Sequence, residues 1–169
     1  NYLPWDPLDH SEMMHEQYGF SLHPGPRDRT FNLYAKTEDH ANSVHDFLKY
    51  LKFGYGRGTD DASSEIRHGR LGRDDGLVLA KFFDSRVPIA WGDYLGYIGV
   101  EEAEVVDGLR PLADPAWGEK DGITERMAAL QPHGLSFYKV HKAIGPALRY
   151  PYYHMLDGYR VMRETRVTL

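Results

Sequence analysis

The chain has 169 residues, of which 41% are hydrophobic and 27% charged, a composition typical of one globular domain with its own core. Its formal net charge of −5 argues against non-specific nucleic-acid binding, because phosphate neutralisation needs a basic surface. The lack of cysteine excludes disulfides and thiolate metal sites, and no apolar run approaches the roughly 18 residues of a membrane helix. We therefore expect a cytoplasmic protein that binds no nucleic acid and has no membrane span.

The sequence begins with NYLPWDPLDH, which has neither an initiator methionine nor the basic and apolar segments of a signal peptide. This beginning favours a piece of a longer protein. A first helix is predicted over 7–18, with Asp6 as its N-cap, Pro7 in the first helical position and Gly19 as the stop. Its buried side is expected to carry three side chains, namely Met13, Met14 and Tyr18.

Residues 21–36 contain a Pro-Gly-Pro sequence and then a short aromatic alternation, which predicts a loop with at most one extended segment. The clearest helical pattern covers 38–53 and ends before Gly54. Apolar residues recur in it at spacings of three and four, as one buried helical face requires, at Val44, Phe47, Leu48 and Leu51.

The rest of the chain predicts further short helices. One is expected over 60–68 with Thr59 as its cap, because acidic residues fill its first turn and basic residues its last. The aromatic and basic tail from Ser136 shows no clear periodicity of apolar residues, so no element is predicted there. The predicted fold is mostly α, with several short helices of the kind that pack on a larger α/β domain. The remaining predicted helices cover 73–85, 89–99, 100–109 and 123–130.

The segment from Lys52 to Arg73 concentrates groups that suit an anion site. Glycine backbone N–H groups approach a ligand closely, a helix N-terminus follows them, and guanidinium groups offer paired donors. The alternative is a purely structural network of ion pairs, and composition alone leaves both interpretations open. The glycines are Gly54, Gly56 and Gly58, and the arginines are Arg57, Arg67, Arg70 and Arg73. The carboxylates available for a network are Asp60, Asp61, Glu65, Asp74 and Asp75.

Other patterns in the chain are weaker evidence for a function. The nine histidines form no HExxH motif, and pairs such as His10 and His15 have the wrong spacing for one helical face. No metal site is therefore predicted. The dipeptide His45-Asp46 also occurs in HD-type phosphohydrolases, which gives a third and weaker functional hypothesis. The tail aromatics favour a core or interface role over base or sugar stacking.

Residues 45–76, HDFLKYLKFGYGRGTDDASSEIRHGRLGRDDG, resemble the signature segment of the N-acetyl sugar amidotransferases of lipopolysaccharide and surface-glycan biosynthesis. That segment reads roughly HDYLKFxKFGxGRATDHASxDIRxGRxTREE, and YLPWD and EQYGF upstream are similar to the region before it. The resemblance covers about residues 1–110, weakly extends to Gly122, and leaves out the tail. The fitting positions are Lys52, Phe53, Gly54, Gly56, Arg57, Thr59, Asp60, Ala62, Ser63, Ile66, Arg67, Gly69, Arg70 and Arg73.

The resemblance implies part of an α/β PP-loop (adenine nucleotide alpha hydrolase-like) enzyme that uses ATP and Mg²⁺. Such an enzyme activates an oxygen with ATP and releases pyrophosphate, so that ammonia can displace AMP. The substrate would be a nucleotide-linked sugar whose acetamido group becomes an acetamidine. A glutaminase partner would supply the ammonia.

The sequence departs from that family in several places. The SGGxDS-type phosphate loop and the early Cys-rich segment are both absent. Asp61, Gly58 and Gly72 stand where the family usually has His, Ala and Thr. We therefore expect the C-terminal part of an amidotransferase, with residues 1–110 as its helical region and residues 111–169 as a loop-rich tail. The PP-loop portion would lie upstream or on a partner chain.

The site expected from these considerations binds the phosphate or carboxylate groups of a nucleotide sugar or ATP, and no general base is identified. The rival hypothesis is a non-catalytic module that docks on a partner carrying the ATP site. The residues expected to hold the anion are Lys52, Arg57, Arg67 and Arg70, and those expected to orient them or contact sugar hydroxyls are Thr59, Asp60, Ser63 and Glu65.

Overall fold

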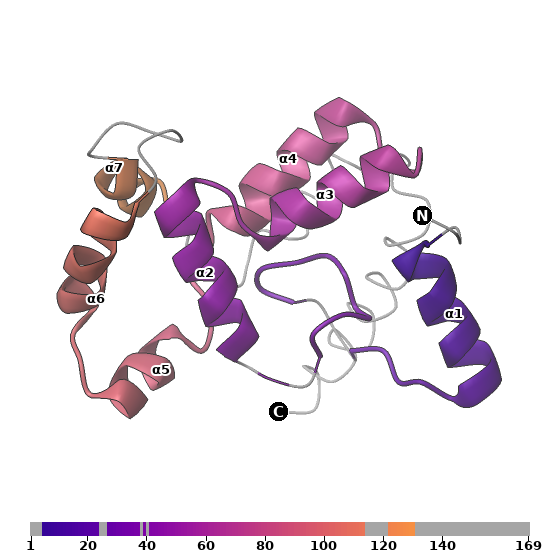
Figure 1. Cartoon of the computed structure of the whole chain (residues 1–169), viewed down its shortest axis with the longest axis horizontal. Coiled ribbons are helices and arrows are strands. Elements are labelled where there is room, and N and C mark those ends of the chain that lie inside the picture. Colours follow the sequence, from indigo (N-terminus) through magenta and orange to yellow (C-terminus); the bar gives the residue numbers. More distant parts are fainter. Residues whose placement is uncertain (1–4, 24–26, 38, 40, 114–121, 131–169) are drawn as a thin grey trace, which may run out of the picture.

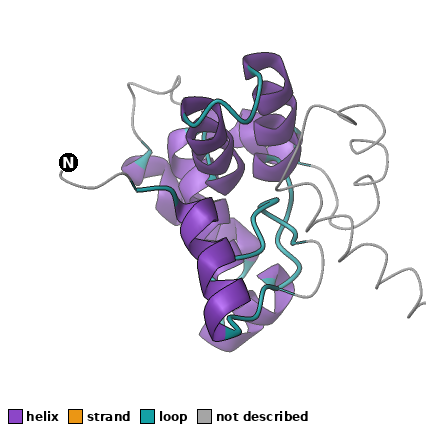
Figure 2. Ribbon diagram, turned by 90° about the vertical axis from the view of Figure 1, so that its right-hand side faces the viewer, coloured by secondary structure: helices purple, strands orange, loops and turns teal. Residues whose placement is uncertain are grey.

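The computed structural model describes residues 5–23, 27–37, 39, 41–113 and 122–130. Within these ranges the chain forms helices and loops and no β-strand, which confirms the predicted mostly-α fold (Figure 1 and Figure 2). Most of the predicted tail lies outside the described residues. The helices are α1 (Pro7–Tyr18), α2 (Ala41–Phe53), α3 (Arg57–Arg67), α4 (Arg73–Asp84), α5 (Trp91–Ile98), α6 (Glu102–Leu109), the 3₁₀ turn η1 (Arg110–Leu112) and α7 (Gly122–Ala128).

Helix α1 has the predicted bounds but not the predicted buried face. Asp6 is its N-cap, with the carboxylate accepting a hydrogen bond from the Leu8 N–H at 3.0 Å, and Gly19 ends it in the left-handed conformation. The buried residue is Leu8, whereas Met13, Met14 and Tyr18 are exposed, so that part of the prediction is wrong. The side of α1 that faces the segment at 31–34 carries Leu8 and then polar residues such as Ser11 and Glu12, so its later apolar side chains lie on the exposed side.

Helix α2 forms as its apolar spacing predicts. The carboxylate of Asp39 accepts a hydrogen bond from the Ala41 N–H at 2.7 Å, and Gly54 follows the helix with a φ of 81°. The predicted core face is confirmed, and it packs on Trp91 of α5, whose indole meets the Phe47 ring edge to face. The buried residues of this cluster are Val44, Phe47, Leu51 and Trp91, with Leu48 partly buried against it.

Helix α3 begins earlier than predicted. Gly56 is its N-cap, so Thr59 lies within the first turn and is not the cap. The Asp84 carboxylate at the end of α4 takes the capping role from across the hairpin, because it accepts hydrogen bonds from the N–H groups of Gly56 and Gly58 at 2.8 Å. Local sequence reasoning missed this cap because its acceptor is more than twenty residues away.

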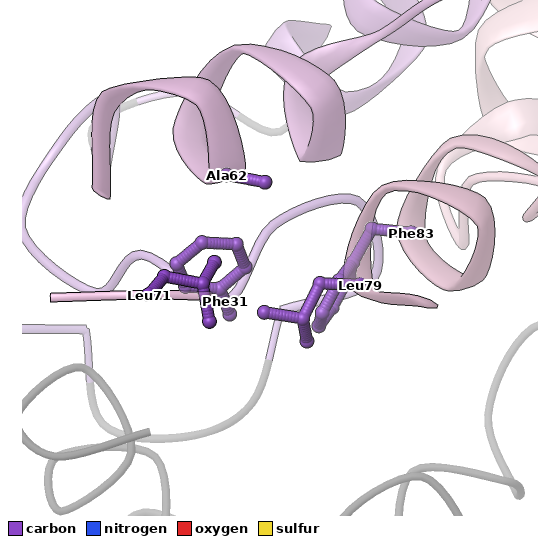
Figure 3. Close-up of a cluster of buried hydrophobic side chains, with 5 residues drawn as sticks. All are labelled: Phe31, Ala62, Leu71, Leu79 and Phe83. Atoms are coloured by element: carbon purple, nitrogen blue, oxygen red, sulfur yellow. The ribbon is translucent and has the colours of Figure 1, made fainter. Parts of the chain in front are cut away.

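Helices α3 and α4 lie side by side as a helical hairpin (Figure 1). Their approach is close: a methyl group on Gly58 would lie 2.7 Å from Phe83 Cβ, so only glycine fits there. Figure 3 shows the apolar cluster that the hairpin encloses with the segment at 27–37. Its buried members are Phe31, Ala62, Leu71, Leu79 and Phe83.

The short helices α5, α6 and α7 gather at the end of the molecule opposite α1 (Figure 1). The Trp91 indole N–H donates to the Glu102 carboxylate at 2.6 Å, which joins α5 to α6. Arg126 on α7 donates to the Leu51 carbonyl at 2.9 Å, which satisfies a free carbonyl near the end of α2. In the described part of the chain, no helix has both the length and the apolar character needed to cross a membrane.

Candidate functional site

A pocket of about 240 Å³ lies between the start of α1, the segment at 31–35 and one side of α3. The segment contributes Phe31, Asn32 and Tyr34 to its lining. A second cavity of about 30 Å³ between α1 and the same segment has room for about one water molecule. The larger pocket is therefore the candidate ligand site, and α3 lines it with Arg57, Asp60, Asp61, Ser64 and Glu65.

The wall at 31–35 is held by polar side chains within the protein. Arg27 donates to the carbonyls of Asn32 at 3.1 Å and of Lys36 at 2.6 Å, and it also donates to that of Ala35. The Asn32 side-chain oxygen accepts from the N–H groups of Tyr34 and Ala35 at 2.8 and 3.0 Å. Burial lowers the pKa of Arg27 and raises that of Tyr34. These bonds fix the wall before any ligand arrives.

Arg29 anchors the same segment to the core. It is 1% exposed, donates to the carbonyls of Arg86 and Asp46, and lies 5.2 Å from the centre of the Phe47 ring. Burial lowers its pKa to about 10, and the charge of Asp84 opposes this shift most strongly. The buried cation therefore depends on nearby carboxylates for compensation.

Arg57 lies at the centre of the charges beside the pocket. Its Nε is 3.3 Å from the Asp46 carboxylate on α2, and its Nη1 is 3.9 Å from Asp61 on the next turn of α3. Asp61 also accepts a hydrogen bond from the Thr30 hydroxyl. Burial raises the pKa of Asp61 to about 7, against the lowering effects of Thr30 and Arg57.

Arg70 joins α1 to α3 at the pocket's edge. Its Nε and Nη2 donate to the Glu65 carboxylate at 2.6 and 2.9 Å, and the same guanidinium donates to both oxygens of Asp6. The hydrogen bond to Glu65 is the main cause of its raised pKa. His68 Nε2 is 3.7 Å from the Asp6 carboxylate. The N-cap of α1 is thus tied to a carboxylate of the pocket.

We expect Arg70→Ala to destabilise the protein by about 2 kcal/mol, because Glu65 is 5% exposed at its side chain and would lose both of its donors. Arg70→Lys should recover only part of this, since lysine lacks the planar fork. Urea unfolding measures the difference. The control Arg73→Ala, at an exposed position, should stay within about 0.5 kcal/mol of the wild type, and equal effects of the two alanine variants would contradict the prediction.

The structure brings three of the predicted site residues into the pocket lining, namely Arg57, Asp60 and Glu65. Arg70 contacts this wall through Glu65. Thr59 faces α4, where its hydroxyl donates to Asp84 at 2.6 Å. The predicted residues that do not line the pocket are therefore Lys52, Thr59, Ser63, Arg67 and Arg70, of which Lys52 lies 4.7 Å from the centre of the Phe53 ring and Arg67 is exposed.

The glycine N–H groups predicted to meet a ligand face the protein's own carboxylate instead. Asp84 accepts from Gly56, Gly58 and Thr59, so the N-terminus of α3 already has an anion. The alternative of a structural ion-pair network is found for two arginines, because Arg57 pairs with Asp61 and Arg70 with Glu65. The polar segment from Lys52 to Arg73 therefore stabilises the fold through ion pairs and also contributes residues to the pocket lining.

Among the described residues, no group of three His, Asp or Glu side chains is placed to hold a metal ion. His45 lies 3.4 Å from Asp46, but that carboxylate also pairs with Arg57 and Lys36. This part of the chain therefore provides neither a cluster for Mg²⁺ nor the further ligands that an HD-type phosphohydrolase needs.

Several residues of the site were not predicted. Arg27, Asn32 and Tyr34 sit in a segment without helical or strand period, where sequence gives no signal of contact. Asp84 carried a usable signal, because a carboxylate in the last turn of a helix opposes the helix dipole and needs a partner elsewhere. Asp46 was noted only for its neighbour His45, although it is buried and pairs with Arg57.

The protein class defined by this fold and pocket is a small helical domain with a polar pocket. The family described as "LPS biosynthesis protein WbpG-like, C-terminal domain" matches residues 28–130, which is more than half of the chain. The chain belongs to this family of lipopolysaccharide biosynthesis domains. The match covers α2 to α7 and the segment at 31–35, but not α1. No curated protein and no solved structure matches the chain.

Proposed function

We propose that this chain is the sugar-binding part of a cytoplasmic, ATP-dependent amidotransferase that acts on a nucleotide-linked N-acetyl sugar in lipopolysaccharide biosynthesis. The observation that carries the proposal is the pocket beside α3, in a domain of a lipopolysaccharide biosynthesis family. Its wall is held in place by Arg27 and Asn32, as a specific binding site requires.

The chemistry of the lining favours hydroxyl groups over phosphates. Carboxylates only accept hydrogen bonds, whereas sugar hydroxyls both donate and accept. The lining holds three carboxylates, those of Asp60, Asp61 and Glu65, and one guanidinium, that of Arg57, so acceptors outnumber cationic donors there. At about 240 Å³ the pocket is also below the roughly 300–1,000 Å³ of drug-sized sites, which suits one sugar ring rather than a whole nucleotide sugar.

In the proposed reaction ATP is a co-substrate. The acetamido oxygen attacks the α-phosphorus of ATP and releases pyrophosphate, and ammonia then displaces AMP from the acetamido carbon to leave an amidine. We place the ATP-binding part outside the described residues, because the N–H groups at the start of α3 are bonded to Asp84. A glutaminase partner would supply the ammonia.

The test uses the intact protein with ATP, ammonia and a set of nucleotide-linked N-acetyl sugars. We expect pyrophosphate release that depends on the sugar, together with a product in which NH replaces the acetamido oxygen, as seen by mass spectrometry. A heavy-oxygen label placed in the acetamido carbonyl should end in AMP. Sugar-independent ATP hydrolysis, or label that stays in the sugar, would refute the proposed function.

Two arginines on α3 give a matched pair for testing the pocket. Arg57→Ala should weaken nucleotide-sugar binding about 10- to 100-fold in a calorimetric titration, because Arg57 is the guanidinium of the lining. Arg67→Ala should leave binding unchanged, since Arg67 is exposed and outside it. Ser64→Phe provides a second variant, because a ring at this lining position should fill the pocket and abolish binding. Equal losses for both arginine variants would contradict the pocket assignment.

A second candidate function is that of a docking module for the partner that carries the ATP site. Besides those of α1 described above, large apolar side chains are exposed on α4 and α5, which is the observation that favours it. This candidate predicts that the chain alone binds no nucleotide sugar and elutes with its partner in size-exclusion chromatography. The exposed side chains are Leu77 and Val78 on α4 and Tyr97 and Ile98 on α5.

A further inference from the structure

Asp61 differs from the other two carboxylates of the pocket. Asp60 is at the solvent edge, with 41% of its side chain exposed, and pairs with Lys49 at 2.5 Å. Glu65 gives both oxygens to Arg70. Asp61 is 9% exposed, and its Oδ2 accepts from the Thr30 hydroxyl. Within the described part of the chain, its Oδ1 accepts no hydrogen bond and lies 3.9 Å from Arg57 Nη1.

This arrangement is suited to taking up a proton. Thr30 lies outside the pocket lining and holds one oxygen of Asp61, which orients the carboxylate and leaves the other oxygen for a ligand in the pocket. Arg57 is too distant for a hydrogen bond but close enough to favour the charged form. A buried base must have such a neighbour, because an isolated carboxylate in an apolar site would remain protonated.

Charged and titratable groups face Asp61 from α2, from α3 itself and from the segment at 27–37. Burial raises its pKa to about 7, against the effects of Thr30 and Arg57, while the carboxylates of Asp60 and Asp46 act in the same direction as burial. A general base works best when its pKa is near the operating pH. The groups facing Asp61 are Asp46 on α2, Arg57, Asp60 and Glu65 on α3, and Arg27 and Tyr34 in the segment at 27–37.

We propose that Asp61 is the general base of the amidine-forming step, and that its carboxylate takes a proton from the attacking nitrogen. This inference rests on the proposed function. When the ammonia lone pair forms the new C–N bond, the nitrogen carries a positive charge. Asp61 removes one proton from it. The C–O bond to AMP then breaks, AMP leaves with the electron pair, and the substrate nitrogen's lone pair completes the amidinium. Asp61 returns its proton to solvent after product release.

The experiment compares the intact wild-type protein with Asp61→Asn at a fixed concentration of unprotonated ammonia. Wild-type amidine formation should rise with pH through about 7, as Asp61 loses its proton. At saturating sugar we expect Asp61→Asn to form amidine at a rate about 10²-fold lower and to lose that rise with pH. Sugar-dependent pyrophosphate release should persist, because it precedes the proton transfer.

Two further variants keep the test decisive. Asp74→Asn neutralises an exposed carboxylate at the start of α4 and should leave the rate and pH profile unchanged. Thr30→Val removes the hydroxyl that stabilises the charged form of Asp61, so the rise should move to higher pH even if Asp61→Asn does not fold.

The outcomes separate the two proposals. If the wild type shows no sugar-dependent pyrophosphate release, the proposed function fails, and this inference fails with it. If the wild type is active and Asp61→Asn forms amidine at the wild-type rate with the same pH profile, only the assignment of Asp61 is wrong. Loss of pyrophosphate release in Asp61→Asn, or an unmoved profile in Thr30→Val, also overturns it, because Asp61 would then support binding or folding instead.

Discussion

Asp84→Ala is expected to destabilise the protein by about 3–5 kcal/mol, enough to unfold a marginally stable domain. Asp84 is 4% exposed and serves two buried partners at once. It caps α3 by accepting from the N–H groups of Gly56, Gly58 and Thr59 and from the Thr59 hydroxyl. Removing the carboxylate leaves these donors buried without an acceptor, which costs about 1–3 kcal/mol for each donor that no water reaches.

The charge of Asp84 also acts on the buried cation Arg29. A methyl group on Gly56 would lie 2.7 Å from Asp84 Oδ1 and 3.1 Å from Arg29 Nη2, so the two charged groups converge on one point of the backbone. Asp84 is also the charge that most strongly opposes the lowered pKa of Arg29. Without it, Arg29 keeps the carbonyls of Arg86 and Asp46 but loses its main counter-charge.

Thermal and urea unfolding of three variants measure this effect. Asp84→Asn keeps one acceptor oxygen but removes the charge and places an amide donor against other donors, so we expect an intermediate loss of about 2 kcal/mol. Asp75→Ala, in the first turn of α4, should cost less than about 1 kcal/mol, as a residue that only complements the helix dipole. If Asp84→Ala lowers the free energy of unfolding by no more than Asp75→Ala does, the cap and the counter-charge contribute little to stability.

The sequence predicts the helices well because their signals are local. The bounds of α1 follow from Asp6, Pro7 and Gly19. The end of α2 was predicted, whereas its start at Ala41 lies three residues after the predicted one. The start of α3 was predicted three residues late because its cap is supplied by Asp84, far along the chain. A cap supplied by a distant residue leaves no signal in the sequence around the helix end that it caps.

The candidate site was predictable in part. Residue order placed the site on α3, and three of the eight residues named from sequence line the pocket, namely Arg57, Asp60 and Glu65. The opposite wall could not be predicted, because Arg27 and Asn32 act by bonding irregular backbone. Charge counting also does not show which arginines are engaged by the protein's own carboxylates, as Arg70 is by Glu65.

The pH dependence of stability should also differ between the wild type and Asp61→Asn. The ordinary pKa of this carboxyl is 3.8, and burial raises it to about 7 in the folded state. Between these values the folded protein binds more protons at Asp61 than the unfolded chain does, so stability falls as pH rises. The stabilising effect of the protonated group is complete below about pH 4 and is lost as pH rises through about 7.

Asparagine resembles the protonated carboxyl and does not titrate, so Asp61→Asn should become more stable relative to the wild type as pH rises from about 4 to 8. The pKa difference corresponds to a relative gain of at most about 4 kcal/mol. Urea unfolding of both proteins at several pH values measures it, with Asp74→Asn as the control whose difference from the wild type should stay flat. A constant difference between Asp61→Asn and the wild type would mean that Asp61 titrates as an ordinary exposed carboxyl. Because the raised pKa makes the ionised form costly to the fold and useful as a base, Asp61→Asn should gain stability under the conditions in which it loses activity.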